Sequence, residues 1–149
     1  ELGERTGDQQ YRRCARELID QVHRVLGRYR SDDVRKGWIS GLDDERGCHH
    51  PTLGGLRIGK PLRERGANES IDEQREWDRD GQYFHYLTKW IHALCQAAFV
   101  TGDSENVRSA RELAETAFKA FVCRSESGEI IGVYFAPLSL SISRFLAGF

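Results

Sequence analysis

The sequence has little excess charge of either sign and no long hydrophobic run. Its 22 Lys and Arg residues nearly cancel its 23 Asp and Glu residues, which leaves a net charge of −1 over 149 residues. This balance provides no general attraction to nucleic acid or to an anionic membrane surface, so we expect neither as a partner. The hydrophobic stretches are only a few residues long, far below the roughly 18 to 20 residues that span a bilayer.

The start of the chain lacks the apolar core of a signal peptide, and the whole chain lacks methionine. The missing signal peptide predicts a protein of the cytoplasm. Because the chain starts at Glu1 without an initiator methionine, we also expect that residues precede it in the complete protein. The length suits a single domain with an ordinary hydrophobic core.

Cysteine pairs of the CxxC type, which zinc knuckles and redox sites use, are also missing. The four cysteines are widely spaced: Cys14, Cys48, Cys95 and Cys123. We expect free and mostly buried thiols, because disulfides are rare in the cytoplasm. His49 and His50 place further donor atoms beside Cys48, but adjacent side chains rarely converge on one ion. The sequence therefore predicts no metal site and no cofactor.

Apolar residues recur with the helical period in three long stretches, at about 8–26, 81–100 and 104–122. Gly27 stands where the first helix would stop, and Asp80 is placed to act as the N-cap of the second. The short Gly102-Asp103 link predicts that the second and third helices form an antiparallel hairpin.

The remaining chain is less regular. Residues 28–80 are rich in glycine and charge and break the helical period, so they predict a long loop of a kind that is more often functional than idle. Residues 129–135 predict a short strand or β-hairpin, and residues 138–148 a final apolar helix. The expected fold is a mainly α single domain over 1–149.

The second predicted helix is apolar around most of its circumference, which indicates a largely buried helix. Five polar residues fall within a stripe roughly 80° wide, because successive helical residues are about 100° apart. These residues are Gln82, His85, Lys89, His92 and Gln96. A narrow polar stripe on a buried helix predicts the lining of a cavity.

Residues 76–86, with the sequence EWDRDGQYFHY, resemble the start of an inner helix in six-hairpin glycosidase-like proteins. Residues 37–40 and 54–62 resemble loop segments of uncharacterised bacterial members of that superfamily, and the resemblance extends over about residues 10–135. It implies an α/α-hairpin array. A complete toroid of this kind uses about twelve helices and this chain has room for three or four, so we expect a partial toroid that forms homo-oligomers.

The resemblance also implies a saccharide site at the start of the second helix. Glycoside hydrolysis uses two carboxyl groups on either side of the scissile bond, and aromatic rings can stack on a sugar. The candidate catalytic residues are Glu76, Asp78, Asp80 and His85. The candidate ligand-binding residues are Trp38, Arg57, Lys60, Trp77, Tyr83, Lys89 and His92. Because a partial toroid supplies a partial active site, we expect no catalysis from this chain alone.

Several alternatives remain open at this point. The acidic residues before the second helix could serve only its capping and its dipole, with the aromatic residues in the core. His85, Lys89 and His92 lie at i, i+4 and i+7, and could move protons in a sugar epimerase or isomerase. A further alternative is a non-catalytic helical scaffold that self-associates through an apolar edge that includes Leu138–Phe149.

Overall fold

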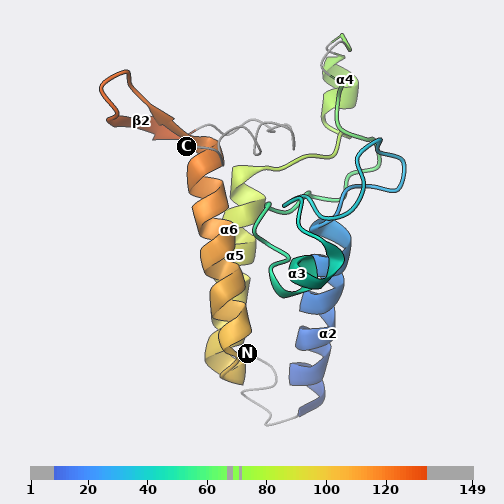
Figure 1. Cartoon of the computed structure of the whole chain (residues 1–149), viewed down its shortest axis with the longest axis vertical. Helices are drawn as coiled ribbons and strands as arrows, with labels where there is room; N and C mark the ends of the chain where they lie inside the picture. The colour runs from blue at the N-terminus through green and yellow to red at the C-terminus, as the bar shows by residue number, and fades with distance from the viewer. Residues whose placement is uncertain (1–8, 67–68, 71, 134–149) are drawn as a thin grey trace.

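The computed structural model describes residues 9–66, 69–70 and 72–133 (Figure 1). The described part is mainly helical, as the sequence predicts. Its helices are α2 (Gln9–Leu26), α3 (Asp44–His49), α4 (Glu73–Glu76), α5 (Phe84–Thr101) and α6 (Ser104–Phe121). Strands β1 (Val122–Arg124) and β2 (Ile130–Val133) form a two-stranded antiparallel sheet. The predicted helix at 138–148 lies outside the described residues.

Helices α5 and α6 form the predicted antiparallel hairpin and lie side by side in Figure 1. Gly102 ends α5 in the left-handed region at φ 71°, and its amide donates to the Ala98 carbonyl. Asp103 then caps α6 by accepting a hydrogen bond from the amide of Glu105 at 3.0 Å. The turn works because glycine tolerates positive φ and an aspartate oxygen satisfies a free amide of the new helix.

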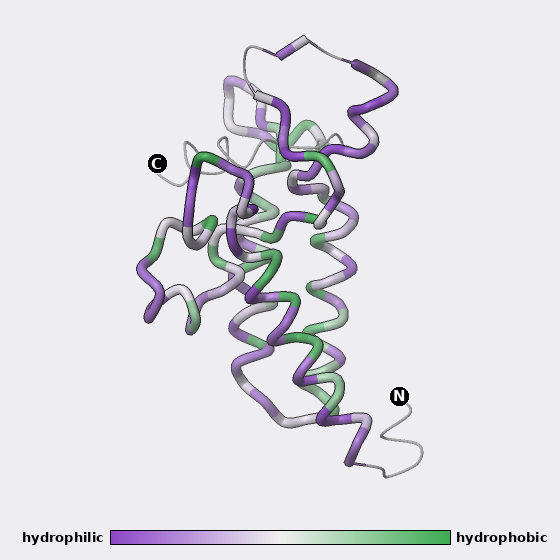
Figure 2. The backbone as a smooth tube through the Cα atoms, turned by 90° about the vertical axis from the view of Figure 1, so that its right-hand side faces the viewer, coloured by the Kyte–Doolittle hydropathy of each residue, from purple (hydrophilic) through white to green (hydrophobic). Residues whose placement is uncertain are grey.

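The apolar core lies between this hairpin, the long connection and the C-terminal end of α2. Its buried members are Leu56, Leu87, Leu113, Ala117 and Phe121, and Val22 and Leu26 of α2 pack against them. The rest of α2 runs alongside the hairpin in Figure 1 but keeps apolar side chains exposed, including Tyr11 and Leu18. Hydrophobic residues recur along all the long helices, whereas the region around α4 is largely hydrophilic (Figure 2). The described residues contain one α/α hairpin, and the toroid stays a prediction.

The connection between α2 and α5 has its own folded packing. Trp38 and Ile39 are each only 2% exposed, and isolated bridges join Arg28 to Trp38 and Leu62 to Arg79. Gly47 of α3 lies so close to Trp38 that an added Cβ would stand 2.2 Å from its Cδ1. The described residues between 28 and 80 therefore form a packed connection that contains two short helices, α3 and α4.

Three structural predictions about α5 are wrong. The helix begins at Phe84 with Tyr83 as its N-cap, so Asp80 does not cap it. Among its described residues only Leu87, Leu94 and Ala98 are buried, because α6, the connection and α2 cover one side of it. Four residues of the predicted polar stripe, His85, Lys89, His92 and Gln96, are exposed and line no buried cavity, whereas Gln82 precedes the helix and is fully buried.

The predicted burial of the four cysteines is also wrong, because all of them are free and exposed. Among the described helices, none is long and apolar enough to cross a membrane.

Candidate functional site

Asp80 and Arg57 form a buried ion pair that joins the segment before α5 to the end of α2. Arg57 Nη1 donates to Asp80 Oδ2 at 2.9 Å. The second Asp80 oxygen accepts from the amide of Gly59 at 2.8 Å. Arg57 also donates to the carbonyl oxygens of Val25 and Arg28. Both side chains have their hydrogen-bonding groups engaged. Asp80 and Arg57, each predicted as a site residue, therefore connect the segment before α5 to the end of α2.

Glu76 lies in a cluster of ion pairs at the end of α4. Its Oε1 is 3.3 Å from Arg65 Nε and 3.1 Å from Arg79 Nε. Arg79 reaches on to Glu69 at 3.1 Å, and Arg63 pairs with the same Glu69 carboxylate. The cluster fixes the short α4 helix against the preceding chain and leaves Glu76 occupied by two guanidinium groups.

Trp77 follows Glu76 and is the most exposed tryptophan, with 74% of its surface open. Lys60 anchors it in two ways. The Lys60 ammonium donates to the Trp77 carbonyl at 2.8 Å and stands 4.7 Å from the centre of the indole ring. A cation over one ring face holds the indole in a defined orientation while the other face stays open to solvent. The exposed Asp78 comes next in the chain.

Three aromatic side chains gather where α5 begins. The rings of Tyr83 and Tyr86 meet edge to face at 6.1 Å, and His85 lies 4.4 Å from Tyr86. Burial raises the pKa of Tyr83, and the nearby Glu76 carboxylate raises it further. Tyr83 is therefore a neutral hydroxyl within electrostatic reach of Glu76.

The other predicted ligand-binding residues do not join this region. Trp38 is buried in the packing around α3, with the Arg28 guanidinium 4.3 Å from its ring centre, so it cannot stack on a ligand. Lys89 and His92 are exposed on the outer side of α5. An epimerase or isomerase site built from His85, Lys89 and His92 stays a prediction.

A buried polar cluster, which the sequence analysis did not predict, lies between the connection and α6. Glu112 is 5% exposed, and its two oxygens contact His50 Nδ1 at 2.6 Å and Thr52 Oγ1 at 3.0 Å. The signal available in the sequence was the position of Glu112 on the side of α6 that also carries Asn106 and Ser109, both buried. An acidic residue among buried helical positions needs a partner.

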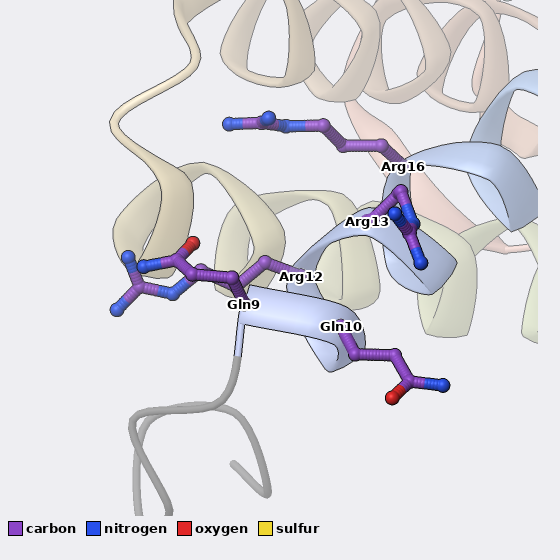
Figure 3. A pocket seen from close by; sticks show the side chains of 5 residues that line it. All are labelled: Gln9, Gln10, Arg12, Arg13 and Arg16. Carbon is purple, nitrogen blue, oxygen red and sulfur yellow. The ribbon is translucent and has the colours of Figure 1, made fainter.

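An open hollow lies at the N-terminal end of α2. Its lining residues all come from that helix: Gln9, Gln10, Arg12, Arg13 and Arg16 (Figure 3). It contains none of the predicted site residues. Among the described residues no group of three or more His, Cys, Asp or Glu side chains is placed to hold a metal ion.

Comparison with known proteins finds no matching family model, no matching curated protein and no matching solved structure. The resemblance to six-hairpin glycosidase-like proteins therefore stays a prediction.

Proposed function

We propose that the chain binds a saccharide on the surface around Trp77 and that it does not hydrolyse this ligand by itself. The observation that supports binding is an indole that is both exposed and held in place by Lys60. A large aromatic face that is already oriented offers apolar contact area to the C–H face of a sugar ring at a small cost in conformational entropy.

The groups around the indole suit a polyhydroxylated ligand. Asp78 is exposed and adjacent in the chain, and its carboxylate can accept hydrogen bonds from sugar hydroxyl groups. Tyr83, further along the chain at the N-cap of α5, has a half-buried phenol that can donate or accept a hydrogen bond. An apolar platform combined with a few polar groups is the usual composition of a small-molecule site.

The pairing of the acidic residues favours binding over hydrolysis. A glycosidase needs one carboxylic acid that donates a proton and a second carboxylate on the other side of the bond. Asp80 is buried against Arg57, and Glu76 is shared by Arg65 and Arg79. Both carboxylates are already paired with arginine side chains. We therefore assign Asp80 and Glu76 to holding the site and Trp77 to contacting the ligand.

Titration with a panel of mono- and oligosaccharides, followed by tryptophan fluorescence and calorimetry, tests this proposal. We expect quenching or a spectral shift from Trp77, because Trp38 is buried and Trp90 is half-buried and hydrogen-bonded. Trp77→Ala should abolish binding. Phe99→Ala is the matched control, because Phe99 is an exposed aromatic residue on another part of the chain and its loss should leave binding intact. No binding across the panel by the folded wild-type protein would refute the proposal.

Self-association is a second candidate function, and the exposed apolar surface of the long helices favours it. Phe99 is 80% exposed, and Val107 and Phe118 on α6 are each about half exposed. Tyr11 and Leu18 form a comparable exposed face on α2. Exposed apolar residues at helical spacing are typical of helices that pack against further helices, as in a toroid.

Sedimentation over a wide range of protein concentrations tests self-association. We propose that a second copy covers the hairpin surface, so Phe99→Asp should shift the mass towards the monomer. Val34→Asp is the control, because Val34 is 96% exposed in the connection and outside this surface. A wild-type protein that stays monomeric at the highest concentration would exclude this candidate without affecting the saccharide proposal.

A further inference from the structure

Half of the apolar stripe of α2 faces away from the core. Tyr11, Leu18 and Val25 follow one another at intervals of seven residues, and each is about half exposed. Cys14 and Gln21, which come three residues after Tyr11 and Leu18, are exposed as well. At about 100° per residue, these five positions fall within an arc of about 80°. They form a strip along nearly the whole helix, which we call the α2 seam.

The other side of α2 attaches the helix to the rest of the molecule. His23 is buried, and Val22 and Leu26 pack against the apolar core. In Figure 1, α2 lies at one edge of the described helices and has the α5–α6 hairpin on one side only. The described part of the chain therefore leaves the seam largely uncovered. Residues at such a and d positions of a heptad are the ones through which two helices pack against each other.

The charges beside the seam favour a second copy of the same helix, in the antiparallel direction. Glu17 and Arg24 flank the seam on one side, seven residues apart, and both are exposed. They occupy g positions of the heptad, and charges that flank a seam set the partner and the orientation of a helix pair. A twofold axis that passes between Ile19 and Asp20 places Glu17 of each copy beside Arg24 of the other. The two flanks then carry two pairs of opposite charges.

The same register gives each residue of the seam a fitting neighbour. Val25 lies opposite Cys14 of the second copy, and a cysteine thiol packs as a small apolar side chain. Leu18 lies opposite the aliphatic part of Gln21. A parallel pair would instead bring identical seam positions together and set each flanking charge against the uncharged positions of the other flank. The charge pattern therefore selects the antiparallel arrangement.

We propose that two copies of the chain pair antiparallel through the α2 seam, with Glu17 of each copy beside Arg24 of the other. This interface goes beyond the self-association proposed for the hairpin surface, because it uses the other long helix and does not involve Phe99. Within one chain, Glu17 contacts Arg13 at 3.9 Å in an exposed pair. Such pairs contribute little, so this contact competes only weakly with the contact between copies.

Sedimentation of charge-swapped variants tests the pairing. Glu17→Arg places two like-charge contacts in the interface and should weaken dimerisation about tenfold. Arg24→Glu should do the same. The double variant Glu17→Arg with Arg24→Glu keeps the wild-type net charge and restores opposite charges across the interface, so it should recover the wild-type affinity. Glu126→Arg is the control, because Glu126 is exposed in the turn of the β-hairpin and its reversal should leave dimerisation unchanged.

Disulfide formation tests the direction of the pair. The other exposed cysteines, Cys48, Cys95 and Cys123, are first replaced by serine. In this background Val25→Cys should link position 25 of one copy to Cys14 of the other under mild oxidation, as peptide mass mapping would show. Without that substitution no link should form, because the two Cys14 residues stand about 16 Å apart along the helices. The Cα atoms of a disulfide lie within about 7 Å.

Three outcomes would overturn the α2 interface. They are a wild type that stays monomeric at the highest concentration, a double variant that pairs no better than the single ones, and a link between two copies of Cys14. Phe99→Asp separates this interface from the hairpin surface, because it should leave the link between position 25 and Cys14 unchanged. Loss of that link in Phe99→Asp would assign the pairing to the hairpin surface and reject the seam.

Discussion

His23 makes the stability of the fold depend on pH in a direction that can be worked out from its surroundings. Burial lowers the pKa of His23 from 6.5 to about 4. Between these two values the unfolded chain binds a proton at this position and the folded chain does not, so stability falls as the pH falls. The contribution of His23 is therefore complete above about pH 6.5 and is lost progressively towards pH 4.

The size of the effect follows from the shift. One pKa unit corresponds to about 1.4 kcal/mol, so the full shift is worth roughly 3 kcal/mol, and about 2 kcal/mol of it is lost between about pH 7 and pH 5. For a chain of this size that loss lowers the melting temperature by roughly 4 to 8 °C. Both values are large for a single histidine because its ring is almost completely buried beside Trp90.

Urea unfolding at about pH 7 and about pH 5 checks this value by comparing the wild type with His23→Gln. Glutamine keeps an oxygen acceptor for Trp90 Nε1 but does not titrate. Other titrating groups act in both proteins and cancel, so the wild type should lose about 2 kcal/mol more than the variant between the two pH values. His49→Gln, at an exposed histidine, should behave like the wild type. An equal loss in the wild type and in His23→Gln would refute the argument.

Two further substitutions test the contacts that hold the connection in place. Asp80→Ala leaves the Arg57 charge without its buried partner and should lower the free energy of unfolding, measured by urea denaturation, by about 3 to 5 kcal/mol. A loss under about 1 kcal/mol would contradict the role given to this pair. Gly47→Ala places a methyl group against Trp38, so it should lower the free energy of unfolding by about 1 to 3 kcal/mol and change the tryptophan emission. Gly132→Ala is the control, because an added Cβ there meets nothing within 4 Å and the free energy of unfolding should change little.

The long helices were predictable because their signals are local. Apolar spacing and glycine or aspartate at the ends place α2, α5 and α6 within a few residues of their observed bounds. The start of α5 was missed because Asp80 satisfies every local rule for an N-cap. Its carboxylate instead pairs with Arg57, which is 23 residues away in the chain. Sequence periodicity has no information about a partner at that distance.

The same limit applies to the candidate site. The resemblance and the residue types predicted Trp77, Asp78 and Tyr83 as site residues, and the structure shows Trp77 and Asp78 exposed and Tyr83 partly buried. The same prediction also included Trp38, whose ring is buried by contacts with Arg28 and Gly47 that only the folded chain reveals. Residue type predicts what a side chain can do, whereas exposure decides whether a ligand can reach it.

Two polar side-chain pairs, which we call clamps, explain how a chain with a small apolar core holds its long connection in one arrangement. They are Arg57 with Asp80 and His50 with Glu112. Apolar packing is tolerant of small shifts, but the Arg57–Asp80 pair and the His50–Glu112 pair are each bonded at defined atoms. The first clamp fixes the chain just before α5, and the second fixes the connection on α6. The first clamp also reaches Trp77 indirectly, because Asp80 accepts from the amide of Gly59 and the next residue, Lys60, donates to the Trp77 carbonyl. Two of the acidic residues that resemble a catalytic set, Asp80 and Glu76, are thus engaged by arginine side chains, while Lys60 holds the indole of Trp77.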